Sequence, residues 1–484
     1  MIFLHKMLYR NGNYNTVKDR NIEKQRIFDN ALAAKRRNES AIDLLTDTVS
    51  LWDYSDLIRK GEHGKIWTDA LQTALCEHEI IIIPPSDEVY WIDKTIVVPS
   101  NTRIVATGAV IRLVPEYPFV MMTNEHVHDG TPAPIRSDDR DTNISICGGS
   151  WEECSQKRGK RPFHNNTDSF FGVQTCMLFN NIEHLTMTDV TFVGALSFCV
   201  QVGDLTDGVF EHFFFISCFA DGLHINGNCE NLYICNFRGH VGDDLVALNM
   251  YDWLGSSINY GPAKNVFCCD IHSARDSKAK AMRLQPGLFK YRDGSIVDCS
   301  LKDMYFKNLS GIYEYKLYFQ SPPYRFEVGE TPEGEGVGSA DNLFFENVDV
   351  ISCRERYPLD DCEETGYFGM FYLNSRIGYI SLENIRYVKP EGDSLRNFLV
   401  AIGPMSWHRM RNNANTEVFD PYISGDVDTL DLKDIFINGE RVQDVNKIVK
   451  MIQFNNVNHD GFSSGKGSVR NIYIDGVKVN PADT

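Results

Sequence analysis

Three aspartates at a regular spacing are the residues of this sequence best suited to do chemistry. Asp221 is followed by the pair Asp243 and Asp244, 22 and 23 residues further along the chain. If the chain coils with that period, Asp221 stacks on the pair at a spacing of about 4.8 Å. Like charges so close together are unfavourable, and their presence therefore indicates a function. Cleavage of a glycosidic bond needs such a set, because one carboxylic acid protonates the leaving oxygen while a carboxylate activates water.

Two other interpretations of these aspartates stay open. Asp221 precedes a glycine, and Asp-Gly is a common turn. Carboxylate oxygens also suit a hard cation such as Ca²⁺. With Ca²⁺ bound and Arg283 as the base, the same residues would perform β-elimination on a uronate. We expect hydrolysis without a metal or cofactor. If it inverts the anomeric centre, the acid and base are predicted to lie about 6.5–9.5 Å apart, and about 5 Å would indicate retention.

Residues near the aspartates are candidates for substrate binding. His224 follows Asp221 by three positions and either lines a subsite or is a hydrogen-bonded core histidine. Arg283 lies in an apolar context, so its guanidinium needs a carboxylate partner or a ligand. Trp253 follows in a loop, where its ring either stacks on a sugar or anchors the loop. The predicted substrate-binding residues are His224, His240, Trp253, His272, Arg283 and Gln285.

Short repeated strands are the elements that would position these residues. A six-residue pattern recurs (apolar, any, apolar, any, Asn or Asp, apolar), as in LTMTDV (185–190), LYICNF (232–237) and LFFENV (343–348). VFEHFF (209–214) fits it with Phe213 in the polar place. The polar places Asp189, Phe213 and Asn236 are 24 and 23 residues apart, and later steps are longer. A repeat with a constant minimum length and a variable number of additional residues is typical of a β-solenoid, in which the additional residues form loops.

The recurring Asn or Asp is expected at a turn, where its side chain bonds nearby backbone, and stacked coils would align these side chains in a ladder. An antiparallel sandwich also has short strands and turns but does not explain a repeat at coil-length spacing. The predicted fold is all-β, a single-stranded right-handed parallel β-helix (β-solenoid). We expect it to form a catalytic domain over residues 65–484.

A helical N-terminal prefix is predicted for residues 1–64. Within residues 21–37 the apolar positions Ile22, Ile27, Phe28 and Leu32 recur at helical spacing. A second helix is predicted over residues 67–76, where the β-helix begins. The prefix is expected to pack on or near the β-helix.

Composition limits the partners and the compartment. The formal net charge of -18 argues against nucleic acid, which needs a basic surface. The sequence has no apolar run of about 18 residues that would predict a membrane span. Its N-terminal apolar run is too short for a signal peptide. The 13 cysteines are odd in number and several occupy apolar strand positions, so reduced, buried thiols are expected. We expect a cytoplasmic protein acting on an oligosaccharide or polysaccharide fragment; a homo-oligomer stays open.

The region of the aspartates resembles the polygalacturonase-like, family 28-type glycoside hydrolases of the pectin-lyase-like β-helix superfamily. That family carries Asn-Thr-Asp-Gly and, one coil later, an Asp-Asp pair. Residues 219–222 here read Phe-Ala-Asp-Gly, and Asp243 and Asp244 match the pair. The resemblance implies that Asp243 is the general acid and that Asp221 and Asp244 bind and activate the water.

Departures from the family pattern bear on the substrate. Arg283 matches the arginine of the family's Arg-Ile-Lys, but Gln285 replaces the lysine. The Gly-His-Gly motif has no clean match, since His240 precedes the acids and His272 lacks the glycines. An uncharged sugar, or a different partner for the substrate carboxylate, is therefore expected rather than polygalacturonate. The predicted function is an inverting glycoside hydrolase; a fructan-cyclising type of transferase, a polysaccharide lyase and a non-catalytic glycan-binding β-helix are the alternatives.

Overall fold

The chain forms two compact units. One comprises Asn30–Met282 (the 30–282 unit), and the other comprises Arg283–Thr484 with Met1–Asp29 (the 283–484 unit). The computed structural model describes residues 17–117, 120–127, 139–153, 175–196, 198–252, 257–274, 281–290, 296–312, 314–318, 338–351, 368–388, 397–403, 425–454, 456–459 and 462–479.

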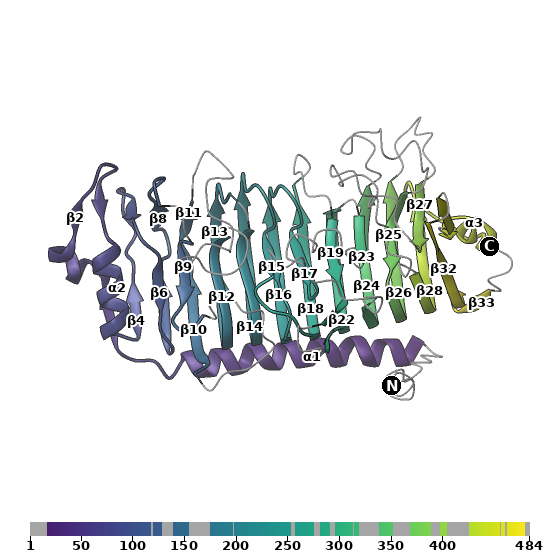
Figure 1. Ribbon diagram of the computed structural model, residues 1–484, viewed down its shortest axis with the longest axis horizontal. Helices are drawn as coiled ribbons and strands as arrows, with labels where there is room; N and C mark the ends of the chain where they lie inside the picture. The colour runs from purple at the N-terminus through teal and green to yellow at the C-terminus, as the bar shows by residue number, and fades with distance from the viewer. Residues whose placement is uncertain are drawn as a thin grey trace. The chain divides into compact units, whose positions relative to one another are not determined.

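Successive coils of the 30–282 unit pair in parallel. β12, β14, β16 and β18 lie side by side (Figure 1), and Gly208, Leu232 and Val266 are opposite one another on three of them. A second column joins β14, β15 and β17, where Val200 is opposite Leu223 and Leu223 is opposite Val246. The strands of this unit are β1 (Thr48–Ser50), β2 (Arg59–Lys60), β3 (Lys65–Ile66), β4 (Ile80–Ile82), β5 (Tyr90–Ile92), β6 (Ile96–Val98), β7 (Thr102–Val105), β8 (Val110–Leu113), β9 (Met122–Asn124), β10 (Asp141–Cys147), β11 (Ser150–Glu152), β12 (Thr175–Thr188), β13 (Thr191–Val193), β14 (Phe198–Ile216), β15 (Leu223–Ile225), β16 (Cys229–Gly239), β17 (Val246–Asn249) and β18 (Ala263–Ser273).

The 283–484 unit repeats the same construction. Leu343 of β24 is opposite Ile380 of β26, and Ile380 is opposite Leu430 of β28. On the next coil, Leu430 is opposite Ile472 of β32. All four side chains are fully buried. The strands are β20 (Gly287–Lys290), β21 (Ile296–Cys299), β22 (Leu301–Ile312), β23 (Glu314–Tyr318), β24 (Ser339–Ile351), β25 (Phe368–Asn374), β26 (Arg376–Val388), β27 (Asn397–Ile402), β28 (Gly425–Ile437), β29 (Glu440–Arg441), β30 (Ile452–Phe454), β31 (Asn456–His459), β32 (Phe462–Ile474) and β33 (Val477–Val479). Parallel register at coil-length spacing confirms the predicted β-helix in each unit.

The predicted asparagine ladder is also confirmed. The polar residue of the repeated hexamer takes a left-handed backbone conformation, with φ of 57° at Asn308, 58° at Asn347 and 52° at Asn384. Asn and Asp are the non-glycine residues that adopt this conformation most readily. The Asn347 side chain donates to Asn308 Oδ1 at 3.0 Å, and Asn384 donates to Asn347 in turn. Each turn is therefore tied to the next coil.

One position of the hexamer pattern was predicted wrongly. In this hexamer the left-handed residue is His212, with φ 56°, and not Phe213. Phe213 is buried and stacks on Phe237 with ring centroids 4.5 Å apart. The hexamer begins one residue earlier, at Gly208, which lies opposite Leu232. The pattern requires an apolar side chain at its first position, so a glycine at that position shifts the predicted register by one residue.

Helix α1 (Val17–Ile42) presents a mixed polar and apolar stripe to the coils. The predicted stripe is wrong at Ile22, which is 53% exposed, although Ile27 is fully buried as expected. The buried positions recur every three or four residues, as one helix face requires. They are Arg20, Lys24, Ile27, Ala31, Ala34, Asn38 and Ile42.

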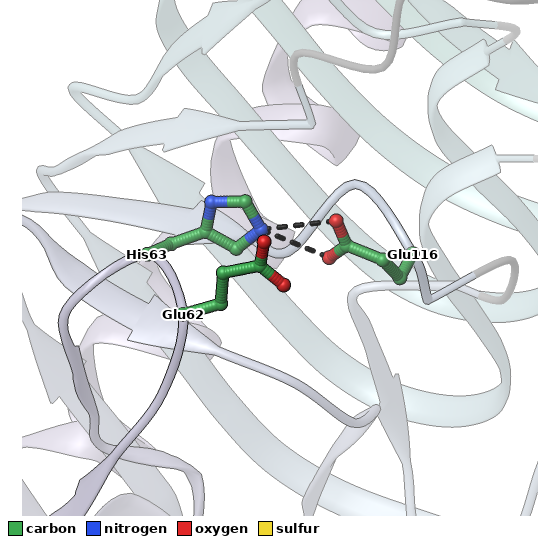
Figure 2. Close-up of side chains that lie close together, drawn as sticks. All are labelled: Glu62, His63 and Glu116. Atoms are coloured by element: carbon green, nitrogen blue, oxygen red, sulfur yellow. Dashed lines mark hydrogen bonds and ion pairs between the residues drawn. The ribbon is translucent and has the colours of Figure 1, made fainter.

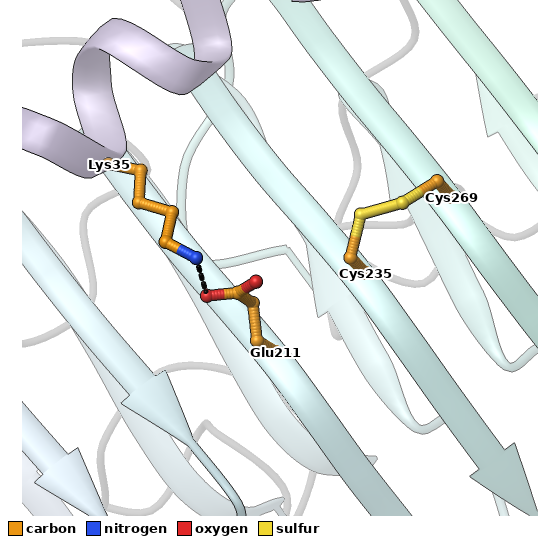
Figure 3. The surroundings of a disulfide bond; sticks show 4 residues. All are labelled: Lys35, Glu211, Cys235 and Cys269. Carbon is orange, nitrogen blue, oxygen red and sulfur yellow. Dashed lines mark ion pairs between the residues drawn. A yellow bond between two sulfur atoms is a disulfide. The ribbon is translucent and has the colours of Figure 1, made fainter.

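Ion pairs explain why charged residues occupy a buried stripe. Within the 283–484 unit, Arg20 pairs with Asp431, and Lys24 Nζ lies 2.6 Å from Glu346 and 2.8 Å from Glu383. Within the 30–282 unit, Lys35 pairs with Glu211 at 2.6 Å (Figure 3). A sequence pattern counts lysine and arginine as surface residues, and their carboxylate partners are remote in sequence.

The segments after α1 begin the sheet earlier than predicted. β1 lies inside the predicted helical prefix and pairs in parallel with β4. It is followed by the 3-10 helix η1 (Leu51–Leu57), so helix is not continuous to residue 64. α2 (Thr68–Glu77) matches the helix predicted over 67–76. The remaining helix is α3 (Val445–Val449), and no described helix has the length and apolar character needed to cross a membrane.

A disulfide between adjacent coils corrects the expectation of reduced cysteines. Cys235 of β16 and Cys269 of β18 are opposite in register, with Cα atoms 4.6 Å apart, and are joined (Figure 3). Both side chains stand on one face of neighbouring strands, where the coil spacing alone brings the sulfurs within bonding reach. The other described cysteines are free thiols, and most are buried as predicted.

Candidate active site

The corner before β15 and the corner before β17 bring the three aspartates together. Asp221 precedes β15, and Asp243 and Asp244 precede β17 one coil later. The backbone N–H of Gly222 donates to Asp244 O at 2.9 Å, and the backbone N–H of Asp244 donates to Asp221 Oδ1 at 3.2 Å. One carboxylate oxygen from each aspartate lies within 4.8 Å of the others. The predicted convergence of these side chains is therefore present.

Glycine allows the two corners to approach so closely. A Cβ on Gly242 would overlap the carbonyl oxygen of Phe219 on the preceding coil. A Cβ on Gly222 would overlap the carbonyl oxygen of Leu245 on the next. Both contacts are with backbone, which cannot move aside as a flexible side chain can. The glycines beside the acids thus fix the stacking that the acid cluster needs.

Burial separates the three acids. Asp221 is 1% exposed and Asp244 is fully buried, while Asp243 is half-buried. Asp243 is therefore the member of the cluster that the described part of the chain leaves most open to a ligand. The other two are held in the protein, where a carboxylate needs hydrogen bonds or a positive charge to stay ionised.

His224 supplies a charge to the buried side of the cluster. Its Nδ1–H donates to Asp221 Oδ2 at 2.7 Å, and its Nε2–H donates to Asp252 Oδ2 at 3.0 Å. Its ring is 1% exposed and stacks on Phe198 with centroids 3.8 Å apart. Burial acts to lower the pKa of His224, but the hydrogen bonds and charges of Asp221 and Asp252 outweigh it and raise the pKa to about 9. Of the two interpretations of His224, the buried, hydrogen-bonded histidine is the one observed.

Asp252 is a member of this network that the sequence did not single out. Asn249 donates to its Oδ2 at 3.4 Å, and the Tyr260 hydroxyl donates to its backbone oxygen at 3.1 Å. Asn226 donates to Asn249 O at 3.0 Å, which links the network to the end of β15. Asp252 follows β17 in a loop, and no coil spacing relates it to Asp221. Only its position beside the acid-bearing coil could have pointed to it.

His240, His272 and Trp253 were also predicted to bind substrate. His240 is half-buried in the corner after β16, and its Nδ1 has no hydrogen-bond partner among the described residues. His272 is half-buried on β18, opposite Arg238. Trp253 lies outside the described residues. Their roles stay predictions.

Two further predicted residues belong to the other unit. Arg283 and Gln285 lie on β19 (Ala281–Gln285) and are assigned to the 283–484 unit. The Arg283 side chain is half-buried and Gln285 is fully buried. The cluster that the structure assembles in the 30–282 unit is therefore Asp221, Asp243 and Asp244 with His224 and Asp252.

The acid-to-base separation of about 6.5–9.5 Å stays a prediction, because it refers to whole carboxyl groups with assigned roles. One oxygen from each aspartate lies within 4.8 Å of the others. Asp221 and Asp244 are in register on adjacent coils, so the spacing of paired strands, about 4.8 Å, brings them close. A separation of about 5 Å between the carboxyl groups of the acid and the base would favour retention over inversion.

Two other groups of described residues have ligand atoms within 4.8 Å of one another. One is Glu62, His63 and Glu116, where His63 Nε2 lies 3.0 Å from both carboxylate oxygens of Glu116 (Figure 2). The other is formed by Glu125, His126 and Asp141. Each contains at least two exposed or partly exposed members. Among these described groups, only the aspartate cluster combines two buried carboxylates with one-coil register, so it is the group best formed to hold a cation or a reacting water.

Comparison with known proteins finds similar solved structures. The exopolygalacturonase of Thermotoga maritima is 11% identical over 92% of this chain and 97% of that chain, with a TM-score of 0.47. A family 28 exopolygalacturonase of Yersinia enterocolitica is 11% identical over 88% and 78%, with a TM-score of 0.42. A tailspike protein of E. coli bacteriophage HK620, in complex with a hexasaccharide, is 12% identical over 81% and 61%, with a TM-score of 0.49. No protein-family model and no curated protein matches the chain.

Proposed function

We propose that this protein is a glycoside hydrolase that uses its aspartate cluster as acid and base. The observation that carries the proposal is the convergence of three carboxylates within 4.8 Å, two of them buried and one half-buried. Burying like charges together is unfavourable unless they serve a reaction or bind an ion. Hydrolysis of a glycosidic bond uses both a proton donor and a water-activating carboxylate.

The roles follow from exposure and position. Asp243 is the proton donor to the leaving oxygen, since it is the acid most open to a ligand. Asp221 and Asp244 together hold the water. A water oxygen about 2.8 Å from each of two oxygens at the 4.8 Å limit makes an angle of about 118°, close to tetrahedral. The short spacing therefore suits a pair of carboxylates that share one water, and direct attack by that water inverts the anomeric centre.

Retention is a second candidate, and the same separation supports it. A carboxylate about 5 Å from the acid can attack the sugar itself and form a glycosyl–enzyme intermediate. Elimination is a third outcome to be tested, because the three carboxylates would also suit a hard cation. The stereochemistry and the chelator sensitivity of the reaction separate these candidates.

We propose an uncharged oligosaccharide or polysaccharide fragment as the substrate. The net charge of -18 disfavours a polyanion. Gln285 also stands where the resemblance places a lysine that would bind a uronate carboxylate.

A product assay tests the proposal. The protein is incubated with neutral and acidic oligosaccharides, with and without chelator, and the anomeric configuration of each product is followed by NMR. We expect a reducing sugar of inverted configuration that does not depend on the chelator. A retained configuration moves Asp221 or Asp244 to the nucleophile role, and an unsaturated or cyclic product overturns hydrolysis.

Asp243→Asn provides the matched variant for this assay. Loss of the proton donor is expected to lower kcat about 10²–10⁴-fold, the usual contribution of general acid catalysis. Asp189→Asn is the control, because Asp189 is exposed at a left-handed turn that asparagine also adopts. Near-full activity of Asp243→Asn would contradict the assignment.

A further inference from the structure

We propose that His224 and Asp252 are positioning residues of this site. They hold Asp221 as an anion in a fixed orientation, so that Asp221 binds the attacking water and does not donate the proton to the leaving group. The inference rests on the proposed hydrolase function. It adds two buried residues to the acid cluster, neither of which needs to touch the substrate.

Both oxygens of Asp221 are already engaged by donors. Oδ2 accepts from His224 Nδ1–H at 2.7 Å, and Oδ1 accepts from the backbone N–H of Asp244 at 3.2 Å. Hydrogen bonds donated to both oxygens stabilise the ionised form of a carboxylate. Rotation of the Asp221 carboxylate would break both bonds. Its orientation and its charge are thus fixed together.

Asp252 completes the arrangement from the far side of the imidazole ring. Its Oδ2 lies 3.0 Å from Nε2 of His224, so each ring nitrogen faces a carboxylate oxygen. This arrangement favours the imidazolium form, in which both nitrogens donate. Asn226 Nδ2 also lies 3.4 Å from Nε2. The neighbours of His224 in strand register are Gln201 on β14 and Ala247 on β17, neither of which titrates. Among the described residues, Asp221 and Asp252 are the charged groups that hydrogen-bond to the ring.

The charge on His224 gives the three aspartates different catalytic roles. Three like charges within 4.8 Å disfavour simultaneous ionisation of all members. Because His224 places a positive charge beside Asp221, we assign the proton of the general acid to another member of the cluster. Asp243 is half-buried and Asp244 is fully buried, so Asp243 is the one that can pass a proton to a leaving group.

Histidine NMR tests the charge of His224 without any need for turnover. The protein is labelled with ¹⁵N-histidine, and His224 is assigned by its absence in His224→Gln. We expect both ring nitrogens of His224 to be protonated at pH 7.5, and neutral imidazole to appear at lower pH in Asp252→Asn than in the wild type. A neutral His224 ring at pH 7.5 would overturn the proposal, whether or not the protein proves to be a hydrolase.

Kinetics test the positioning role on a substrate found in the product assay. We expect His224→Gln to lower kcat about 10–10³-fold with little change in KM, and the acidic limb of its kcat–pH profile to move to higher pH. Asp252→Asn should show the same displacement to a smaller degree. His212→Asn is the control, since His212 is exposed at a left-handed turn. An unchanged pH profile in both variants, with protein that is folded, would refute the positioning role and leave the hydrolase proposal intact.

Discussion

At the scale of single residues, the charge on His224 makes the stability of the fold depend on pH. The pKa of His224 is raised to about 9 by Asp221 and Asp252, from 6.5 when the chain is unfolded. A raised pKa contributes stability that is fully present below the unfolded value and is lost as the pH rises through the folded value. The window of loss therefore runs from about pH 6.5 to about pH 9.

His224→Gln is expected to be less stable than the wild type at pH 6, and the difference is expected to shrink on going to pH 10. The part that disappears is on the order of 3 kcal/mol, since one pKa unit corresponds to about 1.4 kcal/mol. Urea unfolding at several pH values measures it. Other groups that titrate, such as His126 with its pKa raised by Asp141, cancel in the difference. A constant gap across the range would contradict the prediction.

Each left-handed asparagine contributes to the stability of the fold in two ways, through its backbone conformation and through its side-chain hydrogen bonds. Asn347 has φ 58° and exchanges side-chain hydrogen bonds with Asn308 and Asn384. Asn347→Gly keeps the backbone conformation and loses the bonds, at about 1 kcal/mol each. Asn347→Ala also places a Cβ in the left-handed region, which adds about 1–2 kcal/mol. We expect alanine to destabilise more than glycine in thermal unfolding; equal losses would mean that conformation contributes nothing.

At the scale of elements, α1 is attached by buried charges as well as by apolar side chains. Lys24 is the clearest case, because its side chain is 10% exposed and neutralises both Glu346 and Glu383, each about 20% exposed. Removing Lys24 takes the shared, buried cation away from both carboxylates. Among the described residues, the more exposed Lys307 then remains beside Glu346, and Lys433 beside Glu383. Loss of one member of a buried ionic group costs more stability than the intact group contributes.

Lys24→Met is therefore expected to destabilise the 283–484 unit by about 2–4 kcal/mol while keeping the aliphatic length of the side chain. Equilibrium unfolding in urea measures the loss. Ile22→Gln is the control on the same helix, at a position that is 53% exposed, and should change the stability by less than about 0.5 kcal/mol. Similar midpoints for the two variants would show that Lys24 does not anchor the helix.

At the scale of the whole molecule, the disulfide ties two coils of the unit that holds the acids. Cys235 and Cys269 are 34 residues apart in sequence. Closing a loop of that length stabilises a fold by about 3–4 kcal/mol in the chain-entropy model. The Cys235→Ser, Cys269→Ser double variant is expected to lose that amount in thermal unfolding. Cys76→Ser, at an exposed free thiol, is the control.

Chemical mapping provides an independent check. Peptide analysis without reduction is expected to recover the Cys235 and Cys269 peptides as one linked species. Recovery of both as free thiols from the native protein would show that the two sulfurs are stacked but not bonded. The double variant would then lose only the packing of two buried side chains.

The sequence predicted those features that depend on the period of the coil. Asp221 and the pair Asp243–Asp244 meet because they are one coil apart, and the strand register makes that spacing a contact. The asparagine turns were found in the same way. A β-helix repeats its geometry at each coil, so a spacing in sequence becomes a distance in space.

Features that depend on loops or on remote partners could not be predicted. Asp252 reaches His224 from a loop whose path no periodicity determines. No periodic pattern identifies Lys24 as buried, because its partners Glu346 and Glu383 are 322 and 359 residues away in sequence. The close spacing of the acids, by contrast, follows from the coil period and the spacing of paired strands.

The attachment of α1 also has a consequence for synthesis. Arg20 leaves the ribosome 411 residues before Asp431, its partner in the same unit. At about 5–20 residues per second, that interval is roughly 20–80 seconds. Throughout it, the first half of the helix has no complete surface to receive it, and its basic residues are accessible to other acidic partners. The Arg20 end of α1 is thus docked late, and a chain interrupted before β28 would lack the Arg20–Asp431 ion pair although Lys35 would already have its partner Glu211.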